Sequence, residues 1–181
     1  MSRSVHTPTP RFPRALLGLA LLAGLASAPL HAQKASSACE LLQVAEVEAA
    51  LGAKALAKPS GTKQSTPGMT VDVCNVNLSG NHDVSVQIVT NLGTDSAQLL
   101  AIRNNATASE PQWKRAGARL EQSTVGKAIC ILSARPSAAS SAICSIPRGQ
   151  GYVEVQVTGT LAGLPTLTTI AGLVQKANSR L

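Results

Sequence analysis

Val84-Ser85-Val86-Gln87-Ile88 is the stretch that decides the fold, and its pattern returns at Val153-Glu154-Val155-Gln156-Val157. Apolar and polar residues alternate in both stretches, which is typical of strands with one buried face. Cys74 precedes the first stretch by ten residues and Cys144 precedes the second by nine, with a turn between. We interpret this as a faint internal repeat of two β-β-α halves. The alternative, that any two valine-rich hairpins look alike, stays open at this point.

The residues around the two stretches predict further strands. Residues 71–78 alternate, with Cys74, Val76 and Leu78 on the inner face, and the turn 79–82 joins them to the first stretch as a hairpin. Residues 58–69 are rich in Pro, Gly, Ser and Thr and predict a loop. In the second half we expect strands over 119–122, 127–133, 142–147 and 152–158.

Three segments have helical signals. Residues 39–51 carry an apolar stripe at helical spacing, and Gly52 is a natural C-terminal stop. Residues 96–107 follow a capping residue. A last helix is expected from Leu164 or Pro165 to Ala177, with proline in its first turn. The expected fold class is α+β, with an antiparallel sheet or sheets packed against helices.

The first 32 residues have the order of an export signal. Arg3, Arg11 and Arg14 precede the apolar run 15–26, and a small-residue stretch ends at Ala32. The run is shorter than the roughly 20 residues that cross a bilayer. We therefore expect cleavage after about Ala32 and a periplasmic or secreted mature chain without a transmembrane segment. Residues 33–181 then form a single domain, which the repeat divides into halves 39–110 and 111–181.

All four cysteines, Cys39, Cys74, Cys130 and Cys144, lie beyond the signal and allow three pairings. Spacing favours Cys39–Cys74 and Cys130–Cys144, one bridge in each half. Structural zinc needs closely spaced ligand pairs, and no two of these cysteines lie two to four residues apart. We therefore expect disulfide bonds and no metal. The apolar run ends well before Cys39, which favours a soluble protein over a lipid-anchored one.

Composition limits the partners. Without residues 1–32 the chain keeps 13 basic and 9 acidic residues, a net charge of +4. This mild charge permits attraction to an anionic envelope surface without requiring it. Trp113 and Tyr152 are the remaining aromatic residues. Nucleic-acid platforms need several aromatic faces, so we exclude nucleic acid as a partner and disfavour a large aromatic-lined pocket.

Neither candidate for catalysis has the required setting. His82 falls in an expected turn, where an imidazole is solvated. Ser60 and Lys63 match the S-x-x-K pattern, but that chemistry needs serine at the start of a helix and lysine one turn on. We expect no catalytic residue and no cofactor, and therefore no enzyme.

The candidate interface is a polar connector that follows Pro111. It holds Trp113 beside Lys114 and Arg115, with Arg119 nearby. A tryptophan beside basic residues has the composition of an interface anchor. The alternative reading places Trp113 over the edge of the core between the halves.

The segments Cys39-Glu40-Leu41-Leu42 and Ala45 to Gly52 resemble the opening of a known pattern. The chain is similar to a broad family of small bacterial secreted proteins and lipoproteins of unknown function. Their mature domains open with C-x-L-L and a helix ending in A-L-G, and a second cysteine follows in the next strand. The resemblance covers most of residues 39–181. It implies an exported α+β domain with a Cys39–Cys74 bridge, and it implies no activity.

The sequence therefore predicts an exported, soluble, non-enzymatic periplasmic domain that binds a protein or a cell-envelope component. The alternative is a carrier or sensor of a small apolar ligand, held in a groove between helices and sheet.

Overall fold

The computed structural model describes residues 35–80, 82–90, 119–134 and 139–181, and all structural statements below concern these residues. The expected export signal and the expected helix 96–107 lie outside them. Residues 32–181 belong to one compact unit.

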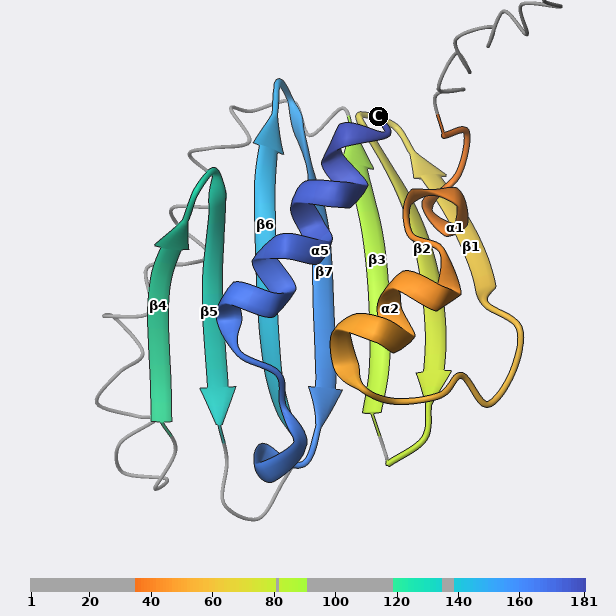
Figure 1. The fold of residues 1–181 in the computed structure, drawn as a ribbon. Coiled ribbons are helices and arrows are strands. Elements are labelled where there is room, and N and C mark those ends of the chain that lie inside the picture. The colour runs from red at the N-terminus through yellow and green to blue at the C-terminus, as the bar shows by residue number, and fades with distance from the viewer. Residues whose placement is uncertain (1–34, 81, 91–118, 135–138) are drawn as a thin grey trace, which may run out of the picture. The chain divides into compact units, whose positions relative to one another are not determined.

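One antiparallel sheet of seven strands dominates the described structure, in the order β1-β2-β3-β7-β6-β5-β4 (Figure 1). Helices α1 (Ala38–Leu41), α2 (Val44–Leu51) and α5 (Leu167–Ser179) lie on one face of it. The expected α+β class fits in this coarse sense, with much more sheet than helix. The strands are β1 (Ser60–Thr66), β2 (Met69–Leu78), β3 (His82–Thr90), β4 (Arg119–Val125), β5 (Ala128–Ala134), β6 (Ser140–Arg148) and β7 (Gly151–Gly159).

The expected strands are confirmed, most of them with wider bounds, but the expected loop over residues 58–69 is wrong. Most of it is β1, which pairs with β2 along its whole length. All seven residues of β1 are exposed, because it forms an edge of the sheet and neither of its faces is buried. A strand without a buried face needs no alternation of apolar and polar residues, so the sequence carried no strand signal here.

The helices differ from expectation at their ends. Residues 39–51 form two helices, because Leu42 and Gln43 have extended backbones. Gln43 begins α2 with a capping box to Glu46, and Gly52 ends it with φ of 64°, a conformation that suits glycine. The expected first-turn proline of the last helix is wrong. Thr166 caps α5 by accepting a hydrogen bond from the Thr169 N–H, so Pro165 precedes the cap.

The strand register supports the internal repeat. Val86 of β3 pairs with Val155 of β7, and this contact joins the two parts of the sheet. Outwards from it, Val86 pairs with Cys74 of β2, and Val155 pairs with Cys144 of β6. The two stretches that decide the fold therefore pair with each other at the centre of the sheet, and each is flanked by the strand that carries its cysteine.

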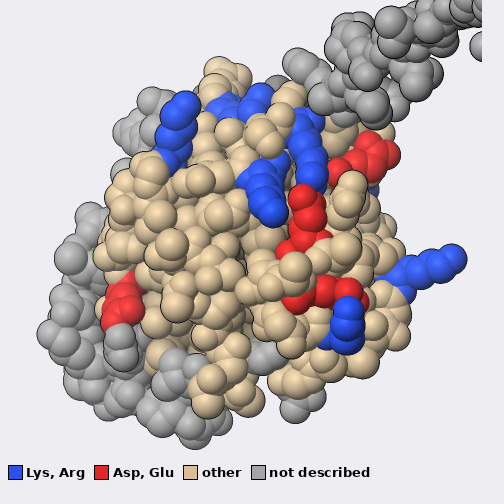
Figure 2. All heavy atoms as spheres, viewed as in Figure 1, with Lys and Arg blue, Asp and Glu red and all other residues tan. Residues whose placement is uncertain are grey.

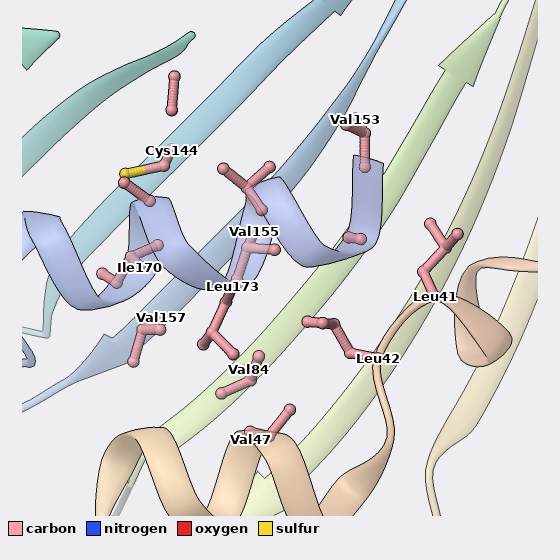
Figure 3. Packing of buried hydrophobic residues seen from close by; sticks show 14 of the residues in the cluster. Leu41, Leu42, Val47, Val84, Cys144, Val153, Val155, Val157, Ile170 and Leu173 are labelled. Atoms are coloured by element: carbon pink, nitrogen blue, oxygen red, sulfur yellow. The ribbon is translucent and has the colours of Figure 1, made fainter. Parts of the chain in front are cut away.

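Apolar side chains fill the space between the sheet and the helices (Figure 3). Val153, Val155 and Val157 of β7 are fully buried there, together with Ile170 and Leu173 of α5. The side chains that would line a groove for an apolar ligand thus pack against one another. Cys74, Val76 and Leu78 are buried on the same face, as expected.

Candidate functional site

Both expected disulfide bonds are present, Cys39–Cys74 and Cys130–Cys144, and no described cysteine is free. They sit at equivalent places in the repeat. Gly61 of β1 pairs with Cys74 just as Cys130 of β5 pairs with Cys144. Cys144 is bonded to Cys130 on the neighbouring strand β5. Cys74 is bonded instead to Cys39 on α1.

The glycine at position 61 leaves room for the sulfur of α1. A Cβ atom added to Gly61 would lie 3.2 Å from Sγ of Cys39, which is a tight approach. The Cys39 sulfur therefore occupies the space that a side chain at position 61 would fill. Disulfide bonds persist in oxidising compartments and are rare in the cytosol, so the pair is typical of an exported chain.

The structure describes only one of the residues expected at the interface, Arg119. Trp113, Lys114 and Arg115 lie outside the described residues. Arg119 begins β4. Ser60 and Lys63 both lie on exposed β1, where residues three apart point to opposite faces, so the S-x-x-K reading fails there.

A different group of basic residues gathers at one end of the sheet. Lys127 lies in the β4–β5 turn, Arg148 ends β6, and Lys176 lies near the end of α5. All three are exposed. Antiparallel pairing places the β4–β5 and β6–β7 turns at the same end, and Figure 2 shows Lys and Arg side chains along that margin. We call this end of the sheet, with these three residues, the cationic end.

Two side-chain contacts fix the cationic end to the last turns of α5. Arg148 donates through Nη1 to the carbonyl oxygen of Asn178 at 3.0 Å and to its Oδ1 at 2.9 Å. Gln175 donates from Nε2 to the carbonyl oxygen of Val125 at 3.3 Å. Each of the two turns is therefore tied to α5 by a side-chain hydrogen bond. Arg148 also places a positive charge where the helix dipole is negative.

The carboxylate that pairs with Lys176 is largely occupied by another cation. Glu46 of α2 accepts hydrogen bonds from Arg180, at 2.7 Å from Nη1 and 2.8 Å from Nη2. Its separation from Nζ of Lys176 is longer, 3.8 Å, and the Lys176 side chain is 58% exposed. Lys127 and Arg148 have no carboxylate partner among the described residues. Glu46 thus mainly balances the charge of Arg180, and the positive charges of Lys127, Arg148 and Lys176 have no equally close carboxylate.

Hydrogen bonds from Arg180 lower the pKa of Glu46 from 4.5 to about 2, against the opposing effect of burial. A bond from the Gln43 backbone and the charges of Arg180 and Lys176 act in the same direction. Arg180 also donates to the carbonyl oxygen of Leu41, so it ties the chain near its C-terminus to α1 and α2.

Glu46→Gln should lower the free energy of unfolding at pH 7 by about 2 kcal/mol, because glutamine keeps the capping box but loses the ion pair. The pKa of Glu46 is depressed by folding, so its stabilisation is full above pH 4.5 and is lost as the pH falls towards 2. Urea unfolding from pH 7 to 2 should show this loss in the unaltered protein and a flatter profile in the variant. Equal pH profiles would contradict the assignment.

The opposite end of the sheet carries charges of both signs. Lys54 pairs with Glu48 at 3.0 Å, and Asp83 is exposed at the start of β3. Lys58 lies exposed in the connection to β1. Basic residues therefore lie at both ends of the sheet, since Arg119 also begins β4 at the opposite end.

Sequence reasoning missed the cationic end, because its members come from three distant segments. The available signal was local: Lys127 and Arg148 each adjoin a turn glycine with positive φ, Gly126 at 61° and Gly149 at 52°. Basic residues beside hairpin turns of one sheet meet at an end only if the strand order puts those turns together. The sequence did not give that order.

A buried carboxylate lies on the face of the sheet away from the helices. Glu154 of β7 is 2% exposed, and Ser145 of β6 donates to it from Oγ at 2.6 Å. Ser145 is also 2% exposed, so the hydrogen bond between the two side chains lies inside the domain. We assign this pair a structural role in joining β6 to β7.

Two searches of the described residues gave negative findings. No three histidine, cysteine, aspartate or glutamate side chains among them are grouped to hold a metal ion. None of the helices in this part of the chain has the length and apolar character needed to cross a bilayer.

Comparison with known proteins found a likeness among solved structures. No protein-family profile and no curated protein matches the chain. Among solved structures it is similar to the extracellular domain of PknH from Mycobacterium tuberculosis, with a TM-score of 0.47 and 14% sequence identity. The match covers 77% of this chain and 94% of that chain.

Proposed function

We propose that this chain is an exported, non-enzymatic binding domain of the periplasm, and that its cationic end contacts an anionic component of the cell envelope. The observation that carries the proposal is the row of Lys127, Arg148 and Lys176 at one end of the sheet, where the carboxylate that pairs with Lys176, Glu46, is engaged with Arg180.

The arrangement suits electrostatic binding for two reasons. The cations are exposed, so their side chains can reach an anionic partner from solvent. Their backbones are held by the bonds from Arg148 to Asn178 and from Gln175 to Val125, so little conformational freedom is lost on binding. Complementary charge of this kind mainly accelerates and orients association.

The disulfide bonds support the assignment to a compartment outside the cytoplasm. Cys130 and Cys144 are both 0% exposed, so this bond lies inside the core and is part of the folded domain. A domain that depends on such bonds folds in an oxidising space, where the anionic polymers and lipids of the envelope are its neighbours.

A matched pair of triple variants tests the proposal. Lys127→Gln with Arg148→Gln and Lys176→Gln removes the cationic end. Lys54→Gln with Lys58→Gln and Lys63→Gln removes the same charge elsewhere. Binding of the mature protein to isolated cell envelopes should fall about tenfold or more for the first variant and little for the second. The binding should also weaken with salt, because the Debye length is about 8 Å at physiological ionic strength.

Two results would overturn the proposal. Equal losses in both triple variants would mean that net charge alone acts. Unchanged binding in the first variant, with folding intact by circular dichroism, would mean that the cationic end is not the contact.

A further inference from the structure

We infer that the anionic component is a phospholipid surface, which the whole row of turns at the cationic end of the sheet contacts at once. This inference rests on the proposed function and assigns its ligand class. The alternative ligands with the same charge are a free phosphate group and a soluble anionic polymer, and the experiment below separates them.

The first argument is the length of the row. The β1–β2, β6–β7 and β4–β5 turns all lie at the same end of the sheet, as the antiparallel order requires. Five strand spacings of about 4.8 Å separate the outer two turns, which is roughly 24 Å. A single phosphate or a small ligand contacts one of these turns, whereas an extended surface contacts all of them.

The second argument is an exposed apolar side chain in the same row. Met69 begins β2 directly after the β1–β2 turn and is 38% exposed. Basic residues beside an exposed apolar side chain are the composition of segments that bind the membrane interface, where cations meet headgroups and apolar atoms enter the acyl boundary. A soluble polyanion can bind the basic side chains, but it has no apolar region that would contact Met69.

The opposite end of the sheet supplies the internal control. Leu56 is 70% exposed there, close in sequence to Lys54 and Lys58. Glu48 and Asp83 also lie at that end, and Glu48 pairs with Lys54. Both ends therefore expose an apolar residue, and Leu56 serves as the control for Met69.

Each basic residue near an anionic leaflet contributes about 1 kcal/mol, which corresponds to about a fivefold change in partitioning. Loss of all three residues of the cationic end should thus reduce vesicle binding by about 100-fold. Met69→Ala should reduce it a few-fold, and Leu56→Ala should leave it unchanged.

Co-sedimentation of the mature protein with vesicles tests the inference. One set contains phosphatidylglycerol and phosphatidylcholine in equal parts, and the other contains phosphatidylcholine alone. Binding is expected only to the first set, with the ranking of variants given above. Inorganic phosphate added at the same ionic strength as sodium chloride should compete no better than the chloride does.

The failure of this inference is distinguishable from that of the proposed function. If the protein binds cell envelopes through the cationic end but does not bind phosphatidylglycerol vesicles, the lipid assignment is wrong and the proposed function stands. If inorganic phosphate displaces the protein far better than chloride, the ligand is a phosphate group and not a surface. If neither envelopes nor vesicles are bound, both proposals are wrong.

Discussion

Replacing Cys39 and Cys74 together by alanine is expected to lower the free energy of unfolding by about 4 kcal/mol, because the bond closes a loop of 35 residues in the unfolded chain. The bond Cys130–Cys144 closes a loop of 14 residues, and its loss should cost about 3 kcal/mol by the same chain-entropy reasoning. The first loss also releases α1 from the edge of the sheet, since Cys39 lies on α1 and Cys74 on β2.

The equivalence of the two bonds gives this prediction a stringent second part. Gly61 stands to Cys74 as Cys130 stands to Cys144. In a Cys39→Ala background, Gly61→Cys should therefore form a bond with Cys74 between neighbouring strands. That bond closes a shorter loop and should restore about 3 kcal/mol of the loss.

Urea unfolding of the oxidised unaltered protein and of the three variants measures these differences. Peptide mapping without reductant identifies the bonds. Failure of Gly61→Cys to pair with Cys74 would contradict the proposed equivalence. A smaller loss for the 35-residue loop than for the 14-residue loop would contradict the entropic ranking.

The sequence predicted those parts of the fold in which one face of a segment is buried. The strands around Val84–Ile88 and Val153–Val157 were predicted because their valines alternate, and the structure buries Val84, Val153, Val155 and Val157. The sequence missed β1 because all of its residues are exposed. The alternation of apolar and polar residues that predicts a strand arises because one face of the strand is buried. An edge strand that is held mainly by backbone pairing does not show this alternation.

The candidate site was less predictable for a related reason. Cys39–Cys74 and Cys130–Cys144 were predicted from spacing, because each pair lies within one half of the chain. Lys127, Arg148 and Lys176 are brought together by strand order instead. The central pairing of β3 with β7 puts the last strands of both halves side by side, and the other strands follow outwards on either side. No local pattern encodes that choice.

Leu173→Ala is expected to lower the free energy of unfolding by about 3 to 4 kcal/mol, because it removes a large buried side chain and leaves a cavity. Leu173 is 2% exposed and belongs to the same buried cluster as Val84 of β3 and Val155 of β7 (Figure 3). It therefore packs where the two parts of the sheet meet, and its loss weakens the contact that joins them.

Leu56→Ala is the matched control for this prediction, since Leu56 is 70% exposed and its truncation should change stability by less than about 0.5 kcal/mol. Thermal and urea unfolding of both variants measure the difference.

The Leu173→Ala variant also tests how the cationic end is held, because α5 carries Leu173 in its middle and Lys176 and Asn178 in its last turns. Hydrogen exchange in Leu173→Ala should rise in α5 and in the β6–β7 turn together, since Arg148 ties that turn to Asn178. Faster exchange in α5 alone would show that the turn keeps its place without the helix, and the cationic end would then not be one rigid unit.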